Sequence, residues 1–196
     1  MRHESLMQDL GTQAPAFALP DPNGRIFTLE SFQGSPALLV AFICNHCPFV
    51  QHIIEGFVKF AAEYAPKGLA SVAISSNDVA EFPEDGPAEM GHFAGRHGLT
   101  FPYLYDESQD IAKAFGAACT PDFFLYDAAR RLAYRGRFDA SRPQTDHSVA
   151  NGIPVTGADL RAAVDAVLAG RPVSANQVPS MGCSMKWKAG NEPVWA

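Results

Sequence analysis

The residues best suited to chemistry are two cysteines, Cys44 and Cys47, with Asn45 and His46 between them. A thiolate is the nucleophile in thiol-disulfide exchange, and a pair with this spacing can alternate between a dithiol and a disulfide. The free N–H groups and the dipole at a helix N-terminus favour the thiolate. We expect a helix to begin at this motif, so that Cys44, nearer to the helix end and more exposed, attacks. The shielded Cys47 then resolves the mixed disulfide.

Two other features predict how this pair is tuned and how it meets a substrate. His46 would place positive charge beside the Cys44 thiolate and make the disulfide more oxidising; the alternative is a solvated residue at the start of the helix. Thr120 and Pro121 precede a predicted strand, and a cis bond between them would set a backbone edge against the cysteines. We expect this turn to dock extended peptide substrates.

The remaining cysteines, Cys119 and Cys183, have two interpretations that the sequence leaves open. Each is either a small buried hydrophobe or a relay thiol for the cysteine pair. Cys119 lies beside the expected docking turn. Cys183 lies near the C-terminus, and if the tail folds over the redox site, Cys183 would exchange with Cys44.

The elements that position these residues follow from hydrophobic periodicity. The apolar run 37–43 has the length of a central strand covered on both faces, and apolar residues recur at helical spacing between 49 and 64. Turn residues between 16–19 and 25–29 predict an N-terminal hairpin. Further strands are expected at 69–75, 103–106, 122–126 and 132–135, and further helices at 88–97, 109–115 and 159–169. This order predicts an α/β fold, a mixed central sheet flanked by helices, with an N-terminal hairpin extension and a C-terminal tail.

Length and composition predict one domain, residues 1–172, with a tail, residues 173–196, packed on it. A chain of 196 residues of which 47% are hydrophobic can build a full core without disulfide staples. The acidic, proline-containing stretch 78–86 is expected to be a surface loop. A basic cluster is expected on a solvated hairpin, with no ligand implied: Arg130, Arg131, Arg135 and Arg137.

Charge and segment composition exclude several classes of function. A net charge of -6 gives no overall attraction for nucleic acid or for anionic lipid. The longest apolar run is far shorter than the roughly 20 residues of a membrane-spanning helix. The first ten residues carry charges and lack the apolar core of a signal peptide, so we expect a cytoplasmic protein. The expected partners are thiols and disulfides of proteins or small molecules.

The order of motifs resembles the thioredoxin superfamily over about residues 11–170: a strand, Cys44 to Pro48, a helix, and Thr120-Pro121 before another strand. Five stretches are similar, more narrowly, to the peroxiredoxin-like branch of the AhpC/TSA (redoxin) family: 14–17, 44–48, 75–78, 119–123 and 182–187. This resemblance implies a thioredoxin-like fold and thiol-disulfide oxidoreductase activity. Its alternative implication is an antioxidant thiol peroxidase.

Peroxiredoxins carry the pattern Pro-x-x-x-Thr-x-x-Cys, and this chain departs from it. With the cysteine of the pattern placed on Cys47, Val40 takes the proline position and Cys44 takes the threonine position. Two residues that activate peroxide in that family are therefore replaced. On this resemblance we predict weak or no peroxide reduction.

Two further alternatives remain from the sequence. A metal site could draw on Cys44, Cys47, Cys183 and either His46 or His52, but no second close Cys/His pair accompanies the first. A buried strand before the motif and a helix after it favour the redox interpretation, so we expect neither a metal nor another cofactor. The other alternative is a binding module of the same fold without turnover.

Overall fold

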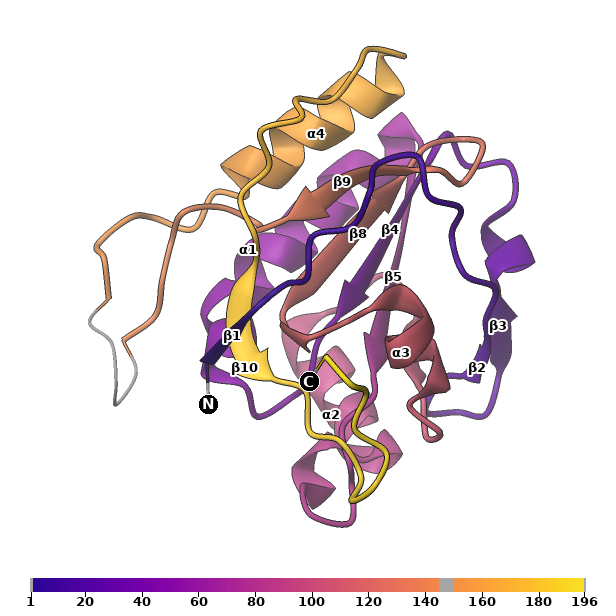
Figure 1. Cartoon of the computed structure of the whole chain (residues 1–196), viewed down its shortest axis with the longest axis vertical. Coiled ribbons are helices and arrows are strands. Elements are labelled where there is room, and N and C mark those ends of the chain that lie inside the picture. The colour runs from indigo at the N-terminus through magenta and orange to yellow at the C-terminus, as the bar shows by residue number, and fades with distance from the viewer. Residues whose placement is uncertain (1, 145–149, 196) are drawn as a thin grey trace.

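The central element is a five-stranded mixed sheet (Figure 1). The computed structural model in which it is seen describes residues 2–144 and 150–195. In spatial order the strands are β6 (Tyr103–Tyr105), β5 (Leu69–Ser75), β4 (Ala37–Phe42), β8 (Asp122–Tyr126) and β9 (Leu132–Gly136). The first three run parallel, whereas β8 and β9 pair antiparallel to their neighbours. At the centre of the sheet, Val40 lies between Val72 and Phe124.

Helices cover both faces of this sheet. They are α1 (Pro48–Tyr64), α2 (Pro87–His97), α3 (Asp110–Phe115) and α4 (Ala158–Leu168), with short 3-10 turns at Leu29–Phe32, Ala65–Lys67 and Pro83–Asp85. Successive side chains of a strand point to opposite faces, so Leu39 packs with α1, α2 and α4, whereas Val40 packs with α3 and the N-terminal hairpin. This burial on two sides explains why every residue of β4 is apolar. Among the residues that the structure describes, every helix is too short or too polar to cross a membrane.

The strands and helices expected from periodicity are present, and their ends agree with the expected ones within two residues. β2 (Ala18–Pro20) and β3 (Ile26–Thr28) form the predicted N-terminal hairpin. In its turn, Asp21 Oδ1 accepts the N–H groups of Asn23 and Arg25 at 2.8 and 2.9 Å. Such side-chain capping is the reason that Asp and Asn mark turns in a sequence.

A second, three-stranded sheet was not expected from the sequence. β10 (Met181–Ser184) lies between β1 (Arg2–Glu4) and β7 (Cys119–Thr120) and runs antiparallel to both. The three strands have three, two and four residues in chain order, too few for an alternating pattern to be recognised. In Figure 1 the yellow β10 lies beside the indigo β1, so segments from the two ends of the chain meet in this sheet.

The expectation that all the arginines around the β8–β9 turn are solvated is wrong for Arg135. Its side chain is fully buried, and its guanidinium forms an ion pair with Asp122. The same group donates to the carbonyl oxygens of Leu6 and Gly116, and it lies 3.7 Å from the ring centroid of Phe124. A buried arginine is stable only with its charge paired and its donors used, and both conditions hold here.

Candidate functional site

The loop between β4 and α1 positions Cys44 and Cys47. β4 ends at Phe42, and α1 begins at Pro48 with Cys47 as its N-cap. Proline is favoured in the first helical turn because its missing N–H needs no partner there. The expectation that Cys44 is the thiol nearer to the helix is therefore wrong, since Cys47 occupies that place. Exposure does not separate the two residues either, because Cys44 is 1% and Cys47 0% exposed.

Thr120, which lies in β7, contacts the sulfur atoms of both Cys44 and Cys47. Its hydroxyl oxygen lies 3.3 Å from Cys44 Sγ, and its carbonyl oxygen accepts a 3.1 Å hydrogen bond from the protonated Cys47 thiol. The Thr120–Pro121 peptide bond is cis. The structure thus brings the cysteine pair together with the turn that the sequence analysis expected to face it.

Cys183 is the third thiol of this cluster. It lies opposite Thr120 in the pairing of β10 with β7 and packs against the core cluster that contains Cys44 and Cys47. The expectation from the sequence was an exchange between Cys183 and Cys44. The interaction that the structure indicates is instead with Cys47, whose pKa Cys183 lowers.

The three thiols differ in their tendency to ionise. Burial raises the pKa of Cys47, but hydrogen bonds from the side chains of Cys183, Cys44 and Thr120 outweigh burial and hold this pKa well below its usual value. The hydrogen bond to Cys47, and then burial, raise the pKa of Cys44 well above its usual value. The same two causes raise the pKa of Cys183. The directions of these shifts favour Cys47 as the thiolate of the cluster, and Cys47 also lies at the positive end of the α1 dipole.

Cys119 has a different environment from the other three cysteines. It is fully buried, its Sγ lies 3.7 Å from the carbonyl oxygen of Pro121, and burial raises the pKa of its thiol well above the usual value. In the described part of the chain, no hydrogen bond joins it to another cysteine. This environment favours the interpretation of Cys119 as a small buried hydrophobe.

Asp85 binds the backbone of the cysteine loop. Its side chain is fully buried, and its Oδ1 accepts the N–H groups of Asn45 and His46 at 2.8 and 3.2 Å. Its Oδ2 accepts a 2.8 Å hydrogen bond from the Asn77 amide. The expectation that 78–86 is a surface loop is therefore wrong at Asp85. No pattern in that stretch distinguishes this acid from its neighbours, so the sequence offered no signal for it.

The imidazole of His46 pairs with the same carboxylate. Its Nδ1 lies 2.7 Å from Asp85 Oδ2, and its ring stacks on Phe82 with the centroids 5.2 Å apart. The hydrogen bond to Asp85 raises the pKa of His46. Burial works to raise the pKa of Asp85, but hydrogen bonds from His46 and Asn77 hold it below its usual value. The positive charge of His46 is thus paired with a carboxylate, which weakens its effect on the cysteines.

One cluster in the described part of the chain has the composition of a metal site. The candidate ligand atoms of Cys44, His46 and Asp85 all lie within 4.8 Å of one another. The oxygens of Asp85 already accept backbone and amide N–H groups, and binding a cation would compete with them. His52, the other histidine considered as a ligand, forms a 2.7 Å hydrogen bond with Ser141 instead. This arrangement favours thiol chemistry over metal binding.

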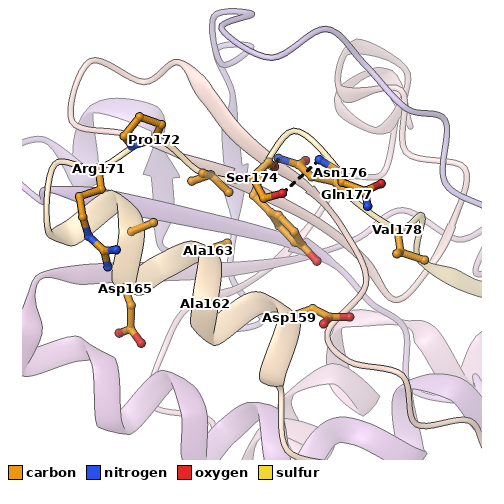
Figure 2. Close-up of a pocket in the computed structure, with 13 residues that line it drawn as sticks. Asp159, Ala162, Ala163, Asp165, Arg171, Pro172, Ser174, Asn176, Gln177 and Val178 are labelled. Atoms are coloured by element: carbon orange, nitrogen blue, oxygen red, sulfur yellow. Dashed lines mark hydrogen bonds between the residues drawn. The ribbon is translucent and has the colours of Figure 1, made fainter.

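Two cavities differ in their relation to the cysteines. One, of about 490 Å³, lies beside the motif, and its lining includes Asn45, His46 and Arg96. The other, of about 500 Å³, is lined by α4 and by the segment 171–178 (Figure 2). None of the four cysteines lines either cavity. The first cavity is the one beside the cysteine pair, because Asn45 and His46 lie between Cys44 and Cys47 in the chain.

Known proteins resemble this chain in sequence and in fold. The AhpC/TSA family matches residues 10–135. The crystal structure of a hypothetical protein from Sinorhizobium meliloti 1021 is 58% identical, with a TM-score of 0.91, and covers 95% of this chain and 99% of that chain. The thiol-disulfide oxidoreductase ResA of Halalkalibacterium halodurans is 28% identical over 115 residues, which are 59% of this chain and 61% of ResA, less than two thirds of its length. The crystal structure of a thiol:disulfide interchange protein of the thioredoxin family from Chlorobium tepidum TLS has 21% identity and a TM-score of 0.60, and the match covers 83% of this chain and 99% of that chain. This similarity confirms the thioredoxin-like fold.

Proposed function

Because this chain belongs to the AhpC/TSA family, we propose that it is a thiol-disulfide oxidoreductase in which Cys44 and Cys47 alternate between a dithiol and a disulfide. The observation that carries this proposal is the contact of both sulfurs with Thr120 at the start of α1: its hydroxyl oxygen lies 3.3 Å from Cys44 Sγ and its carbonyl oxygen lies 3.1 Å from Cys47 Sγ. A thiolate with a second thiol beside it is what disulfide exchange requires. The similarity to ResA, a thiol-disulfide oxidoreductase, supports the same class of reaction.

In the reduced protein, the Cys47 thiolate attacks one sulfur of a partner disulfide. A mixed disulfide forms at Cys47, and the first partner thiolate leaves. Cys44 then loses its proton and attacks the Cys47 sulfur, which closes the internal disulfide and releases the second partner thiolate. Two electrons pass from the protein to the partner, and the two released thiolates take up protons from Cys44 and from solvent.

The residues around the pair position it for this exchange. The Thr120 hydroxyl, 3.3 Å from Cys44 Sγ, can donate a hydrogen bond to the thiolate that forms there. Pro121 is proposed to shape the docking turn, and His46 is proposed to tune the electrostatics of the cysteine loop. The reaction needs no cofactor beyond thiols and disulfides of proteins or small molecules. The cytoplasmic location expected from the sequence stays a prediction that cell fractionation tests.

Peroxide reduction is the weaker proposal for this site. Val40, at the position that peroxiredoxins fill with proline, is fully buried within β4. Cys44 stands where those enzymes carry a threonine, so the hydroxyl donor at that position is replaced by a thiol. Stabilisation of the developing charge on peroxide oxygens depends on such donors. We therefore propose disulfides rather than peroxides as the substrates.

The wild-type protein should catalyse the reduction of insulin or cystine with dithiothreitol as the electron donor. Cys47→Ser should lower the rate at least about 100-fold and Cys44→Ser at least about tenfold, because each removes one partner of the exchange. Cys119→Ser, which changes a buried thiol outside the cluster, is the matched control and should keep the wild-type rate. Circular dichroism checks that each variant is folded.

Two results would contradict this proposal. One is full activity in the Cys47→Ser variant. The other is rapid oxidation of the wild-type protein by hydrogen peroxide in stopped flow, with a rate constant of roughly 10⁷ M⁻¹s⁻¹ or higher, which lies within the range of efficient enzymes. That result would favour a peroxidase.

A further inference from the structure

β10 occupies the strand edge beside the cis-proline turn. It pairs antiparallel with β7, so that Cys183 lies opposite Thr120 and Ser184 lies opposite Cys119. The other edge of β10 pairs with β1. An extended peptide substrate would bind the edge of β7 by the same kind of strand addition. The chain thus fills, with a strand of its own, the edge that the sequence analysis assigned to substrates.

The fit of β10 against β7 is close. A Cβ atom on Gly182 would lie 1.9 Å from the carbonyl oxygen of Thr120, so glycine is required for this approach. The Ser180 hydroxyl donates a 2.7 Å hydrogen bond to the carbonyl oxygen of Pro121. These contacts hold Cys183 within the thiol cluster.

Cys183 is also the thiol of the cluster with the most access to solvent. Cys44 and Cys47 are 1% and 0% exposed, whereas Cys183 is only partly buried. An external thiol therefore meets Cys183 more readily than Cys44 or Cys47. Cys183 lies opposite Thr120, whose carbonyl oxygen is 3.1 Å from Cys47 Sγ, and it packs against the core cluster that contains Cys44 and Cys47, so the strand pairing places it beside the buried pair.

From this arrangement, and resting on the function proposed above, we propose that Cys183 is a third catalytic thiol that passes the disulfide of the buried pair to external thiols. Starting from the Cys44–Cys47 disulfide, the Cys183 sulfur attacks Cys47 Sγ. The bond to Cys44 breaks, its electron pair stays on Cys44, and Cys44 takes up the proton that Cys183 releases. This internal exchange needs no outside oxidant or reductant.

External thiols complete the transfer. The thiolate of a first external thiol attacks Cys183 Sγ, the bond to Cys47 breaks, and Cys47 leaves as a thiolate. Cys47 is the N-cap of α1, and the positive end of the helix dipole stabilises this departing thiolate. A second external thiolate then attacks the sulfur of the first and releases Cys183. The protein gains two electrons, and the external thiols leave as a disulfide.

Disulfide mapping of the Cys44→Ser variant tests the central contact of this proposal. One equivalent of oxidised glutathione should produce a disulfide between Cys47 and Cys183, with both glutathione thiols released. Tryptic peptides distinguish this product, because Lys59 and Arg130 separate Cys47, Cys119 and Cys183. Glutathione joined to Cys47 with Cys183 freely alkylated would overturn the proposal.

The rate of reduction of the oxidised protein by glutathione gives an independent test. Cys183→Ser should slow this reduction at least about tenfold, because the external thiol must then reach the buried pair directly. Cys119→Ser is the control and should keep the wild-type rate. An unchanged rate in a folded Cys183→Ser variant would overturn the role of Cys183 and leave the proposed function intact. Failure of the wild type to form the Cys44–Cys47 disulfide at all would instead overturn the proposed function.

Discussion

Asp85 shows how one buried charge can fix the backbone of a reactive loop. Removing a carboxylate from water costs several kcal/mol unless hydrogen-bond donors surround it. The N–H groups of Asn45 and His46 and the amide of Asn77 supply those donors. Loss of the carboxylate would also leave these N–H groups without a buried partner. The conformation of the cysteine loop therefore depends on a residue that takes no part in the exchange itself.

Asp85→Asn should lower the free energy of unfolding by an amount that depends on pH. Asp85 raises the pKa of His46, so protonated His46 stabilises the fold fully below its unfolded pKa near 6.5, and this contribution is lost as pH rises through the higher folded value. The pKa of Asp85 is lowered, so its carboxylate stays ionised throughout this window. The loss of unfolding free energy in Asp85→Asn should therefore be about 1–2 kcal/mol larger near pH 5.5 than near pH 9.

Urea unfolding at the two pH values measures this difference. Glu84→Gln is the control, because Glu84 is 51% exposed and lies 3.9 Å from His46 Nδ1. An exposed pair of this kind contributes only a few tenths of a kcal/mol. Equal losses in Asp85→Asn at both pH values would show that the aspartate acts only as a hydrogen-bond acceptor.

At the residue scale, the sequence predicted the groups whose spacing is itself a signal. Cys44 and Cys47 form such a pair, and Thr120-Pro121 forms another recognisable motif. Asp85 forms none, because its role depends on the folding of its segment against Asn45, 40 positions earlier in the chain. The order of ionisation of the thiols was not predictable for the same reason, since it depends on the contact between Cys47 and Cys183.

At the scale of elements, long strands and helices could be predicted from their apolar patterns, whereas the short strands of the three-stranded sheet could not. β4 and β5 are long apolar runs buried on both faces, and α1 has a clear helical period. β7 and β10 have two and four residues. Their pairing depends on the close approach of Gly182 to Thr120, which is a tertiary requirement and leaves no periodic pattern.

Gly182→Ala should loosen β10 from β7. The new methyl group would meet the Thr120 carbonyl oxygen at 1.9 Å, and a backbone atom cannot yield without movement of a strand. We expect a loss of about 1–3 kcal/mol in the free energy of unfolding. Alkylation of Cys47 by iodoacetamide should become faster, since β10 covers this part of the site.

Gly95→Ala is the matched control for this substitution. Gly95 lies in α2, and a Cβ there would meet no atom within 4 Å. Alanine at this position should stabilise the protein by up to about 1 kcal/mol, because glycine is the poorer helix former. Thermal unfolding and alkylation rates measure both effects. Wild-type stability and thiol reactivity in Gly182→Ala would show that the strand pair tolerates a wider spacing.

At the scale of the whole molecule, Arg135 joins segments that are far apart in the chain. From β9 it pairs with Asp122 of β8 and donates to the carbonyl oxygens of Leu6, near the N-terminus, and Gly116, after α3. Asp122 in turn accepts the N–H of Ala118, just before β7. One buried ion pair thus connects the central sheet with two segments that flank strands of the three-stranded sheet. Leu6 follows β1, and residues 116–118 precede β7. Its position next to β7 links the stability of the fold to the geometry of the thiol cluster.

Removing one partner of this ion pair should destabilise the whole molecule. Arg135→Met keeps an apolar stem over Phe124 but leaves the Asp122 carboxylate buried without its cation. Burial already raises the pKa of Asp122, and an uncompensated buried charge costs about 3–5 kcal/mol. The free energy of unfolding in guanidinium chloride near pH 7 should fall by this amount.

The double variant Arg135→Met/Asp122→Asn separates charge from packing. Asparagine is close in shape to aspartate and carries no charge, so the double variant should regain a large part of the stability lost in Arg135→Met. Lys67→Met is the control, because it breaks an exposed pair with Glu63 and should cost no more than about 0.5 kcal/mol. If the double variant is no more stable than Arg135→Met alone, the loss comes from the missing contacts of the guanidinium with Leu6, Gly116 and Phe124. In that case Arg135 joins the segments through hydrogen bonds and packing, and its charge contributes little.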